Sequence, residues 1–208
     1  MADDFRKVPR WTLSDLLAFY EGRPRPETWE LVDGVPFMMN LPLIKHQVIA
    51  DTLTMRLDEV LTAVQPAWRA ARQIGVRVPD DEPFCAEPDV AFIDLDFEDD
   101  EVFAERFYCV AEVLSGSDRP ESRDGADKPI VLAAKLDFYK GHAPCRAVLV
   151  VRQDIIAADL HTREGADWRQ AASTRPEERI AIPDVGDIGP LAHLYRHTPL
   201  WQSQFAAL

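Results

Sequence analysis

An acidic run at residues 94–101 divides the stretch 87–115, in the middle of the chain, into two mainly apolar segments. Two apolar runs in this stretch predict two strands. Each run carries one carboxylate where a packed strand rarely tolerates any: Asp89 precedes the first run, and Glu112 interrupts the second. Because side chains alternate between the faces of a strand, Glu112 shares a face with Val110 and Leu114. Isolated buried carboxylates are strongly disfavoured unless they are paired or bind a metal, so Asp89 and Glu112 are candidate functional residues.

The N-terminal part of the chain predicts a helix followed by a hairpin. Thr12 and Asp15 have the spacing of a capping box, which indicates the start of a short helix. Residues 29–39 then contain Asp33-Gly34 between two apolar runs, a strong signal for a tight turn between antiparallel strands. Pro36 places the second strand of this hairpin at an edge.

The period becomes helical over residues 45–64 and again over residues 130–140. In the first of these helices His46 continues the apolar stripe, so its side chain is predicted to face inward. In the second, Lys135 shares a face with apolar residues and should point toward the sheet. Between the two helices, residues 69–79 alternate and predict one strand before the two strands of 87–115.

The remaining pattern completes a mixed α/β chain. The middle reads α–β–β–β–α–β, and neither the order nor the direction of the strands follows from the sequence. We predict a single domain over 1–208, with an N-terminal helical arm (1–28), a core (29–151) and a C-terminal β extension and tail (152–208). Further elements are predicted as strands at 146–151 and 155–160, a strand or hairpin at 167–182, and a short helix within 191–201.

Composition narrows the class of protein. The net charge of −13 argues against broad, non-specific adhesion to nucleic acid, although a local basic groove or bound metal ions would still permit contact. Cys85, Cys109 and Cys145 form no ligand-like pair and are predicted to be reduced core residues. The sequence shows no signal peptide and no apolar stretch of membrane-spanning length, which predicts a soluble, cytoplasmic protein without a membrane partner.

Asp89 and Glu112 have the chemistry of a metal site. If their strands are neighbours, the two carboxylates can converge on one cation, and oxygen ligands without a Cys or His cluster suit Mg²⁺ or Mn²⁺ better than Zn²⁺. Such a metal can activate water and polarise a phosphodiester oxygen. The alternative is that both are partly exposed acids at strand ends that form salt bridges.

A family resemblance adds to this interpretation. Pro88-Asp89 before an apolar strand, with an acid in the next strand, resembles the nuclease signature Pro-Asp…(Asp/Glu)-X-Lys, except that Leu114 stands where the lysine belongs. The restriction endonuclease family usually called Uma-two shares this departure, and the chain resembles it over nearly its whole length. The matching segments, in family order, are WTLSDLLAFYEGRP, WELVDG, KHQVIADTL, EPDVAF, AEVLSGSD, KLDFYKGH, AVLVV, WRQAA…IAIP and LAHLY.

The resemblance implies a fold and a set of catalytic residues. It implies a restriction-endonuclease-like core of the PD-(D/E)XK superfamily, with a central mixed sheet flanked by helices. The missing lysine is expected to have migrated to the following helix, where Lys135 matches it. Glu30, in the first hairpin, and His46 match further family residues. Lys128 and Lys140 are less favoured substitutes for the lysine.

Each assisting residue also has a structural interpretation. Lys135 could be a surface lysine whose stem packs while its head reaches water. Glu30 could be an acid at a strand edge, and His46 a core histidine with satisfied hydrogen bonds.

Two functions follow from the sequence. The first, implied by the resemblance, is a Mg²⁺-dependent DNA endonuclease in which Asp89 and Glu112 bind the metal, Lys135 positions water, and Glu30 and His46 assist. The second is an inactive nuclease-fold module that serves as a DNA-binding or protein-interaction scaffold. A homodimer is compatible with both, because cutting a duplex needs two sites or two events. The cations available for DNA are Arg69, Arg72, Arg77, Arg119 and Arg123.

Overall fold

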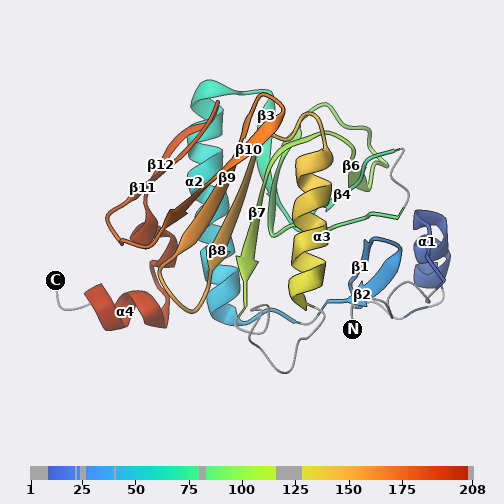
Figure 1. Cartoon of the computed structure of the whole chain (residues 1–208), viewed down its shortest axis with the longest axis horizontal. Helices are drawn as coiled ribbons and strands as arrows, with labels where there is room; N and C mark the ends of the chain where they lie inside the picture. The colour runs from blue at the N-terminus through green and yellow to red at the C-terminus, as the bar shows by residue number, and fades with distance from the viewer. Residues whose placement is uncertain are drawn as a thin grey trace.

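A six-stranded mixed sheet forms the centre of the computed structural model, which describes residues 9–21, 23, 27–39, 41–79, 83–115 and 128–205 (backbone only for 128–130). The strand order is β10-β9-β8-β7-β5-β3 (Figure 1). β7 and β8 are parallel, and the other neighbours are antiparallel. This confirms the predicted mixed α/β class. The strands are β3 (Trp68–Arg72), β5 (Val90–Asp94), β7 (Phe107–Leu114), β8 (Ala147–Arg152), β9 (Ala158–Glu164) and β10 (Asp167–Ser173).

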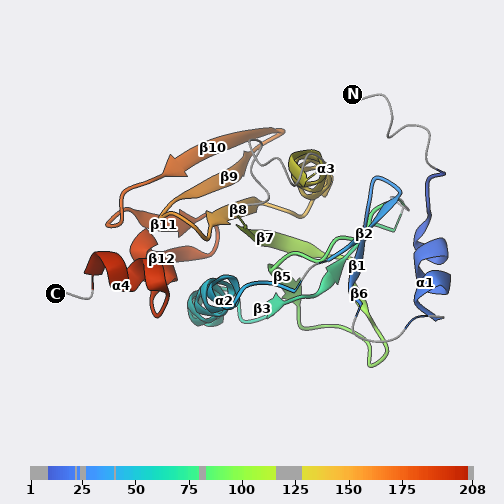
Figure 2. The ribbon, with the colours of Figure 1, turned by 90° about the horizontal axis from the view of Figure 1, so that it is seen from below.

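Two helices cover opposite faces of this sheet, as Figure 2 shows. Helix α2 (Ile44–Val64) lies on one face, and helix α3 (Lys128–Gly141) connects the parallel strands β7 and β8 across the other. Parallel neighbours need such a crossover, because a tight turn can join only antiparallel strands. Both helices were predicted from their apolar period.

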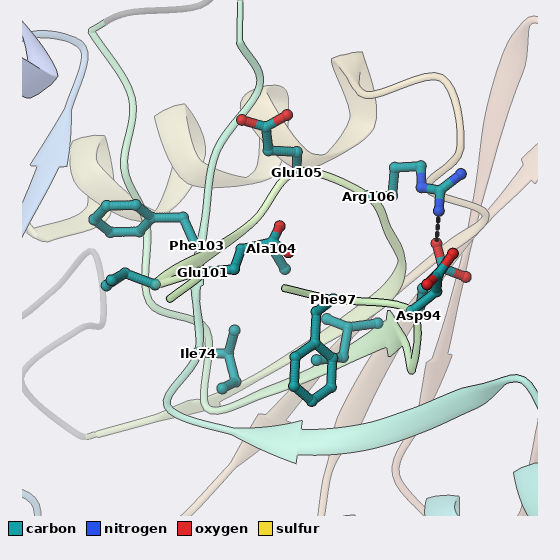
Figure 3. A pocket seen from close by; sticks show the side chains of 11 residues that line it. Ile74, Asp94, Phe97, Glu101, Phe103, Ala104, Glu105 and Arg106 are labelled. Atoms are coloured by element: carbon teal, nitrogen blue, oxygen red, sulfur yellow. Dashed lines mark ion pairs between the residues drawn. The ribbon is translucent and has the colours of Figure 1, made fainter. Parts of the chain in front are cut away.

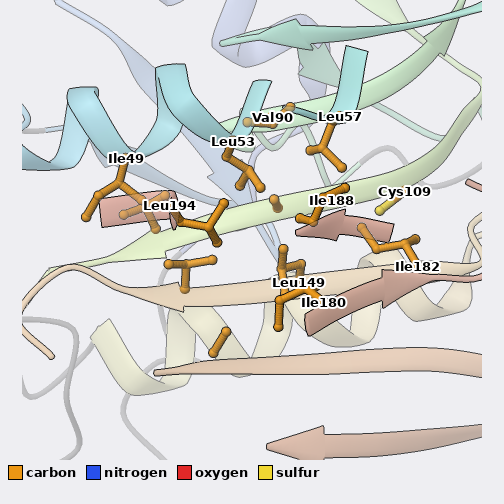
Figure 4. Close-up of a cluster of buried hydrophobic side chains, with 14 of the residues drawn as sticks. Ile49, Leu53, Leu57, Val90, Cys109, Leu149, Ile180, Ile182, Ile188 and Leu194 are labelled. Carbon is orange, nitrogen blue, oxygen red and sulfur yellow. The ribbon is translucent and has the colours of Figure 1, made fainter. Parts of the chain in front are cut away.

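The larger apolar core lies between α2 and the sheet (Figure 4). The predicted stripe of α2 supplies Ile49, Leu53 and Leu57, none of which is more than 1% exposed. The sheet supplies the alternate residues of its central strands, among them Ala111 and Val113 of β7. Val110 packs on the α3 face instead. Glu112, between Ala111 and Val113, must therefore project toward α3, as the period of two predicted.

The N-terminal elements form as predicted and pack beside the sheet. Helix α1 (Leu13–Glu21) begins with the capping box: the backbone N–H of Thr12 donates to Asp15 Oδ2 at 2.8 Å, and that of Asp15 donates to Thr12 Oγ1 at 3.2 Å. Asp33 and Gly34 take φ of 50° and 73°, the left-handed backbone that a tight hairpin turn requires. They join β1 (Trp29–Val32) to β2 (Val35–Met38), which pair only with each other among the described strands.

The prediction of one strand over residues 69–79 was wrong. The chain leaves the sheet at Gln73, whose φ of 52° breaks the extended backbone. β3 ends at Arg72, and β4 (Gly75–Val76) pairs in parallel with β6 (Phe103–Ala104) in a separate two-stranded sheet. The sequence did not predict β6. Ile74, Val76 and Val78 alternate after the break, so the pattern predicted a strand here without revealing where β3 ends.

The C-terminal third extends the central sheet and then covers α2. The predicted strand 155–160 is displaced, because residues 153–157 form a turn whose ends are tied to the Tyr195 hydroxyl: this group donates to Arg152 O at 2.8 Å and accepts from Ala157 N at 3.1 Å. The predicted strand or hairpin at 167–182 forms two strands: β10 pairs with β9, and β11 pairs with β12. The last elements are β11 (Arg179–Ile182), β12 (Gly186–Pro190), the 3₁₀ helix η3 (Leu191–Tyr195) and α4 (Pro199–Phe205).

The cysteines have the predicted core role. Cys85, Cys109 and Cys145 are buried and free, and burial raises the pKa of the Cys145 thiol to about 12. None of the described helices is long and apolar enough to cross a membrane.

His142, just after α3, should make folding dependent on pH. Its ring stacks on Phe107 at 4.1 Å between centroids, and burial, with a contribution from Arg163, lowers its pKa from 6.5 to about 4. Between these values the unfolded chain binds a proton that the folded chain does not, so the free energy of unfolding should fall by about 2 kcal/mol as the pH drops from 6.5 to 4. Urea titrations across this pH range should show the fall in the free energy of unfolding for wild type and not for His142→Gln. The same dependence on pH in both proteins would contradict the prediction.

Candidate active site

The five residues singled out in the sequence gather at one end of the sheet, although they come from five parts of the chain. Glu30 lies on β1 and Glu112 on β7, Asp89 directly precedes β5, His46 lies in the first turn of α2, and Lys135 lies on α3. The hairpin β1–β2 and helix α3 approach each other beside this end of the sheet (Figure 1).

Lys135 bridges two buried carboxylates. Its Nζ lies 2.8 Å from Glu30 Oε1 and 2.8 Å from Glu112 Oε1. All three residues are buried, with exposed fractions of 1% for Glu30, 5% for Lys135 and 7% for Glu112. The ammonium therefore does not reach solvent, and Lys135 is not a surface lysine with a packed stem. Glu30 is likewise not an exposed acid at a strand edge.

Asp89 adjoins this ion-paired group through the strand register. Val90 pairs with Ala111, so Asp89 lies level with Glu112. Its Oδ2 accepts a hydrogen bond from the backbone N–H of Val113 at 2.7 Å and lies 3.3 Å from His46 Nε2. His46 thus faces inward, as its place on the apolar stripe predicted, and its ring holds Asp89 from the other helix. The other ring nitrogen, Nδ1, is buried and has no hydrogen-bond partner among the described residues.

In each of the three carboxylates, Glu30, Glu112 and Asp89, the described residues donate hydrogen bonds to only one of the two oxygens. Glu30 Oε1 accepts from Lys135 and from the backbone N–H of Glu87 at 2.7 Å. Glu112 Oε1 accepts from Lys135, and Asp89 Oδ2 from Val113. The described residues donate no hydrogen bond to the second oxygens, Glu30 Oε2, Glu112 Oε2 and Asp89 Oδ1. Fixed carboxylates with a spare oxygen are suited to binding a cation.

The chain is similar to known proteins over most of its length. The profile of the Uma2 (Uma-two) family, described as "Putative restriction endonuclease", matches residues 13–189, which is most of the chain. The chain belongs to this family. A crystal structure described as a "putative nuclease belonging to DUF820" from Anabaena variabilis ATCC 29413 has the same fold, with a TM-score of 0.59 at 15% identity over 88% of this chain and 97% of that one. No curated protein matches.

Two further residues complete the site of this Uma2-family chain, and the sequence analysis missed both. The hydroxyl of Tyr139 donates to Glu112 Oε1 at 2.7 Å, the same oxygen that Lys135 contacts. Tyr139 follows Lys135 by four residues, so both lie on one face of α3. Glu87 precedes Asp89 by two residues and is partly buried beside Glu30. In both cases the signal was the spacing from a residue already chosen.

The electrostatics of the site are dominated by its excess of acids. Burial, reinforced by Asp89 and Glu30, raises the pKa of Glu112 to about 7 even though Lys135 opposes the rise. Burial and Glu30 likewise raise the pKa of Glu87 to about 6. Four carboxyl groups therefore face one ammonium ion and one histidine. Such crowded acids favour an additional cation, because each charge raises the cost of ionising its neighbours.

The pKa values of Lys135 and His46 are raised as well, which in these bases favours the charged form. Burial alone would lower the pKa of Lys135, but the Glu112 and Glu30 carboxylates raise it well above its ordinary value. Burial would also lower the pKa of His46, and the hydrogen bond and charge of Asp89 outweigh this effect and raise it. Lys135 thus stays charged throughout the physiological range.

The residues fit Mg²⁺ by the chemistry of their donors. The oxygens to which the described residues donate no hydrogen bond belong to carboxylates, and Mg²⁺ is typically held by one or two carboxylates together with water. The described residues contain no group of three or more His, Cys, Asp and Glu side chains placed to hold a metal by themselves. A site built from Asp89 and Glu112 would therefore need water or substrate oxygens to complete its coordination.

The less favoured substitutes for Lys135, and the arginines proposed to contact DNA, are not part of this buried group in the described residues. Lys140 Nζ lies 6.0 Å from the centre of the Trp168 ring, and the side chain of Lys128 is outside the described residues. Arg119 and Arg123 are also outside them. Of the five arginines proposed as cations, the three within the described residues are each paired with an acid: Arg69 with Asp58, Arg72 with Asp51, and Arg77 with Glu105.

Proposed function

We propose that this chain is a Mg²⁺-dependent endonuclease that hydrolyses DNA phosphodiester bonds. The observation that carries the proposal is the position of Lys135: a lysine from the helix after β7 contacts the acid of β7, beside the Asp of the Pro-Asp pair. The signature lysine is absent from β7, where Leu114 stands, and α3 supplies an ammonium ion to the same acid. Membership of a restriction endonuclease family supports a nuclease as the general activity.

Asp89 and Glu112 are the residues that would hold the metal. Asp89 Oδ1 and Glu112 Oε2 accept no hydrogen bond from the described residues, and the register of β5 and β7 puts the two residues at the same level of the sheet. A bound Mg²⁺ or Mn²⁺ would lower the pKa of a coordinated water and offset the charge of a phosphate. Tyr139 and Val113 fix the opposite oxygens, so the two carboxylates need little reordering to bind a cation.

Lys135 would act as a fixed positive charge and not as a base. Hydrolysis forms a bond between a water oxygen and phosphorus and breaks a phosphorus–oxygen bond to the sugar, while negative charge grows on the phosphoryl oxygens. A buried ammonium ion stabilises that charge and can orient the attacking water. Because the pKa of Lys135 is raised, it does not release its proton to act as a base near neutral pH.

Glu30 and His46 would position these groups. Glu30 holds Lys135 from β1, and the backbone N–H of Glu87 holds the same oxygen of Glu30. His46 holds Asp89 from α2. Residues fixed by such neighbours keep catalytic groups within the narrow range of geometry that reaction requires.

DNA would be bound locally at the metal site, because Arg69, Arg72 and Arg77 are each paired with an acid and the chain carries a net charge of −13. The metal ion would then offset part of the repulsion between the acids and the phosphates. A homodimer, which would provide two active sites for the two strands of a duplex, remains a prediction.

The proposal is tested by cleavage of supercoiled plasmid with Mg²⁺ or Mn²⁺, with EDTA as the blank, for wild type and Glu112→Gln. We expect metal-dependent conversion to nicked and linear DNA by wild type and none by the variant, because a neutral amide at this position cannot supply a negative ligand. Calorimetric titration with Mn²⁺ should show binding by wild type. If the folded protein binds neither metal at millimolar concentrations, the proposal fails and the scaffold interpretation takes its place.

A further inference from the structure

A hollow lies at the opposite end of the strands that carry the candidate nuclease site. It begins at Asp94, the last residue of β5, whereas Asp89 precedes the first residue of that strand. The five residues of β5 separate the two ends by about 16 Å. The hollow has a volume of about 300 Å³ and lies between β5 and the small sheet of β4 and β6 (Figure 3).

The lining of this hollow is partly apolar. Ile74, Ile93 and Phe103 contribute to its wall, and so do Phe97 and Val102 from the segment between β5 and β6. Phe97 is 59% exposed and Val102 is 71% exposed. Large apolar side chains that stay exposed around a hollow are typical of a surface that binds a partner. In Figure 3, Phe97 and Ile74 lie on one side of the hollow, below Phe103 and Ala104.

The rim is strongly acidic. Residues 94–106 contain seven acids and one arginine, a net charge of −6 out of −13 for the whole chain. Arg106 pairs with Asp94 at 2.8 Å, and Arg77 pairs with Glu105. The five other acids form no ion pair with the described residues: Asp96, Glu98, Asp99, Asp100 and Glu101.

Charge and geometry together define what this surface can bind. A field of this sign repels nucleic acid and attracts cations. The described acids do not converge into a group of three that could hold a metal ion. A volume of about 300 Å³ has room for one or two apolar side chains. The chemistry that satisfies both features is a peptide segment with positive charges around an apolar side chain.

We propose that this hollow is a docking site for a basic peptide segment of a partner protein. An apolar side chain of the peptide enters between Ile74 and Phe103 and contacts Phe97. Lys or Arg side chains beside it pair with Asp96 and Glu101. The buried apolar contact provides affinity, and the charges provide specificity and fast association. The site is independent of the nuclease site and does not rest on the proposed activity.

Selection of peptides from a random displayed library against the full chain tests the proposal. Enriched peptides should carry net positive charge and at least one Leu, Ile, Met or aromatic residue. One such peptide, synthesised with a fluorescent label, should bind the wild type in fluorescence anisotropy and lose affinity as salt rises. Enrichment of neutral or acidic peptides, or of none, would overturn the proposal.

Variants of the rim complete the test. Phe97→Ser and Glu101→Lys should each weaken the labelled peptide about tenfold or more, since each removes one of the two kinds of contact. Glu177→Lys makes the same change of charge on an exposed loop away from the hollow and should bind like wild type. Circular dichroism should show all three folded, because Phe97, Glu101 and Glu177 are exposed. Equal affinity of the three variants for the labelled peptide would contradict the docking site, whether or not nuclease activity is found.

Discussion

Lys135→Met should abolish DNA cleavage and also destabilise the fold. The substitution keeps most of the length of the side chain and removes the charge that contacts Glu30 and Glu112 at 2.8 Å. Loss of a group that stabilises developing charge typically lowers kcat by about 10²–10³-fold. Loss of one partner of a buried ion pair leaves an uncompensated charge and costs about 3–5 kcal/mol. Cleavage should therefore be assayed well below the unfolding temperature, and stability by urea denaturation.

Two further variants separate catalysis from stability. Lys135→Met leaves two buried carboxylates without their ion-pair partner. Adding Glu30→Gln removes one of these charges and should restore part of the lost stability, but not the cleavage. Lys140→Met, on the same helix but beside Trp168, should change neither. Unchanged urea midpoints for Lys135→Met would show that the buried ion pairs are not formed in solution. Unchanged cleavage would remove Lys135 from the mechanism.

Asp89→Asn should weaken Mn²⁺ binding and abolish cleavage with little change in stability. The amide retains an oxygen that can accept from Val113 N–H, so the strand contact can survive, whereas the negative charge is lost. Hard divalent cations depend on that charge. Isothermal titration of Mn²⁺ should show binding weakened by at least about 10-fold, a loss of roughly 1.4 kcal/mol or more.

The matched control is Asp94→Asn at the other end of the same strand. Asp94 accepts hydrogen bonds from the Tyr108 hydroxyl at 2.9 and 3.0 Å and pairs with Arg106. Its substitution should lower stability modestly and leave the affinity for Mn²⁺ unchanged. If Asp89→Asn binds Mn²⁺ as tightly as Asp94→Asn does, Asp89 is not a metal ligand.

Local pattern was enough to predict most of the elements. Helices α1, α2 and α3, the β1–β2 hairpin and the strands β5, β7 and β8 follow from apolar periods and from the Asp33-Gly34 turn, because these signals depend on a few neighbouring residues. The break at Gln73 and the late start of β9 were missed. Both depend on contacts far away in the chain, such as the one between the Tyr195 hydroxyl and the turn after Arg152.

The candidate site shows the same division. Family motifs pointed to Asp89, Glu112, Lys135, Glu30 and His46, and the fold brings them together. Neither Tyr139 nor Glu87 stood out, because a tyrosine on a helix and a glutamate before a proline have common structural explanations. Only the packing of α3 against β7 shows that the Tyr139 hydroxyl contacts Glu112.

The sequence by itself determined which residues are acids on apolar strand faces and which lysine faces the sheet, since the periods of strand and helix decide both. Only the tertiary structure decided that Glu30, Glu112 and Lys135 form one buried group, and that the acidic loop borders a hollow lined by Phe97 and Phe103. The physical reason is that charge pairing and hollows depend on distances between segments remote in the chain. Local periodicity contains no information about those distances.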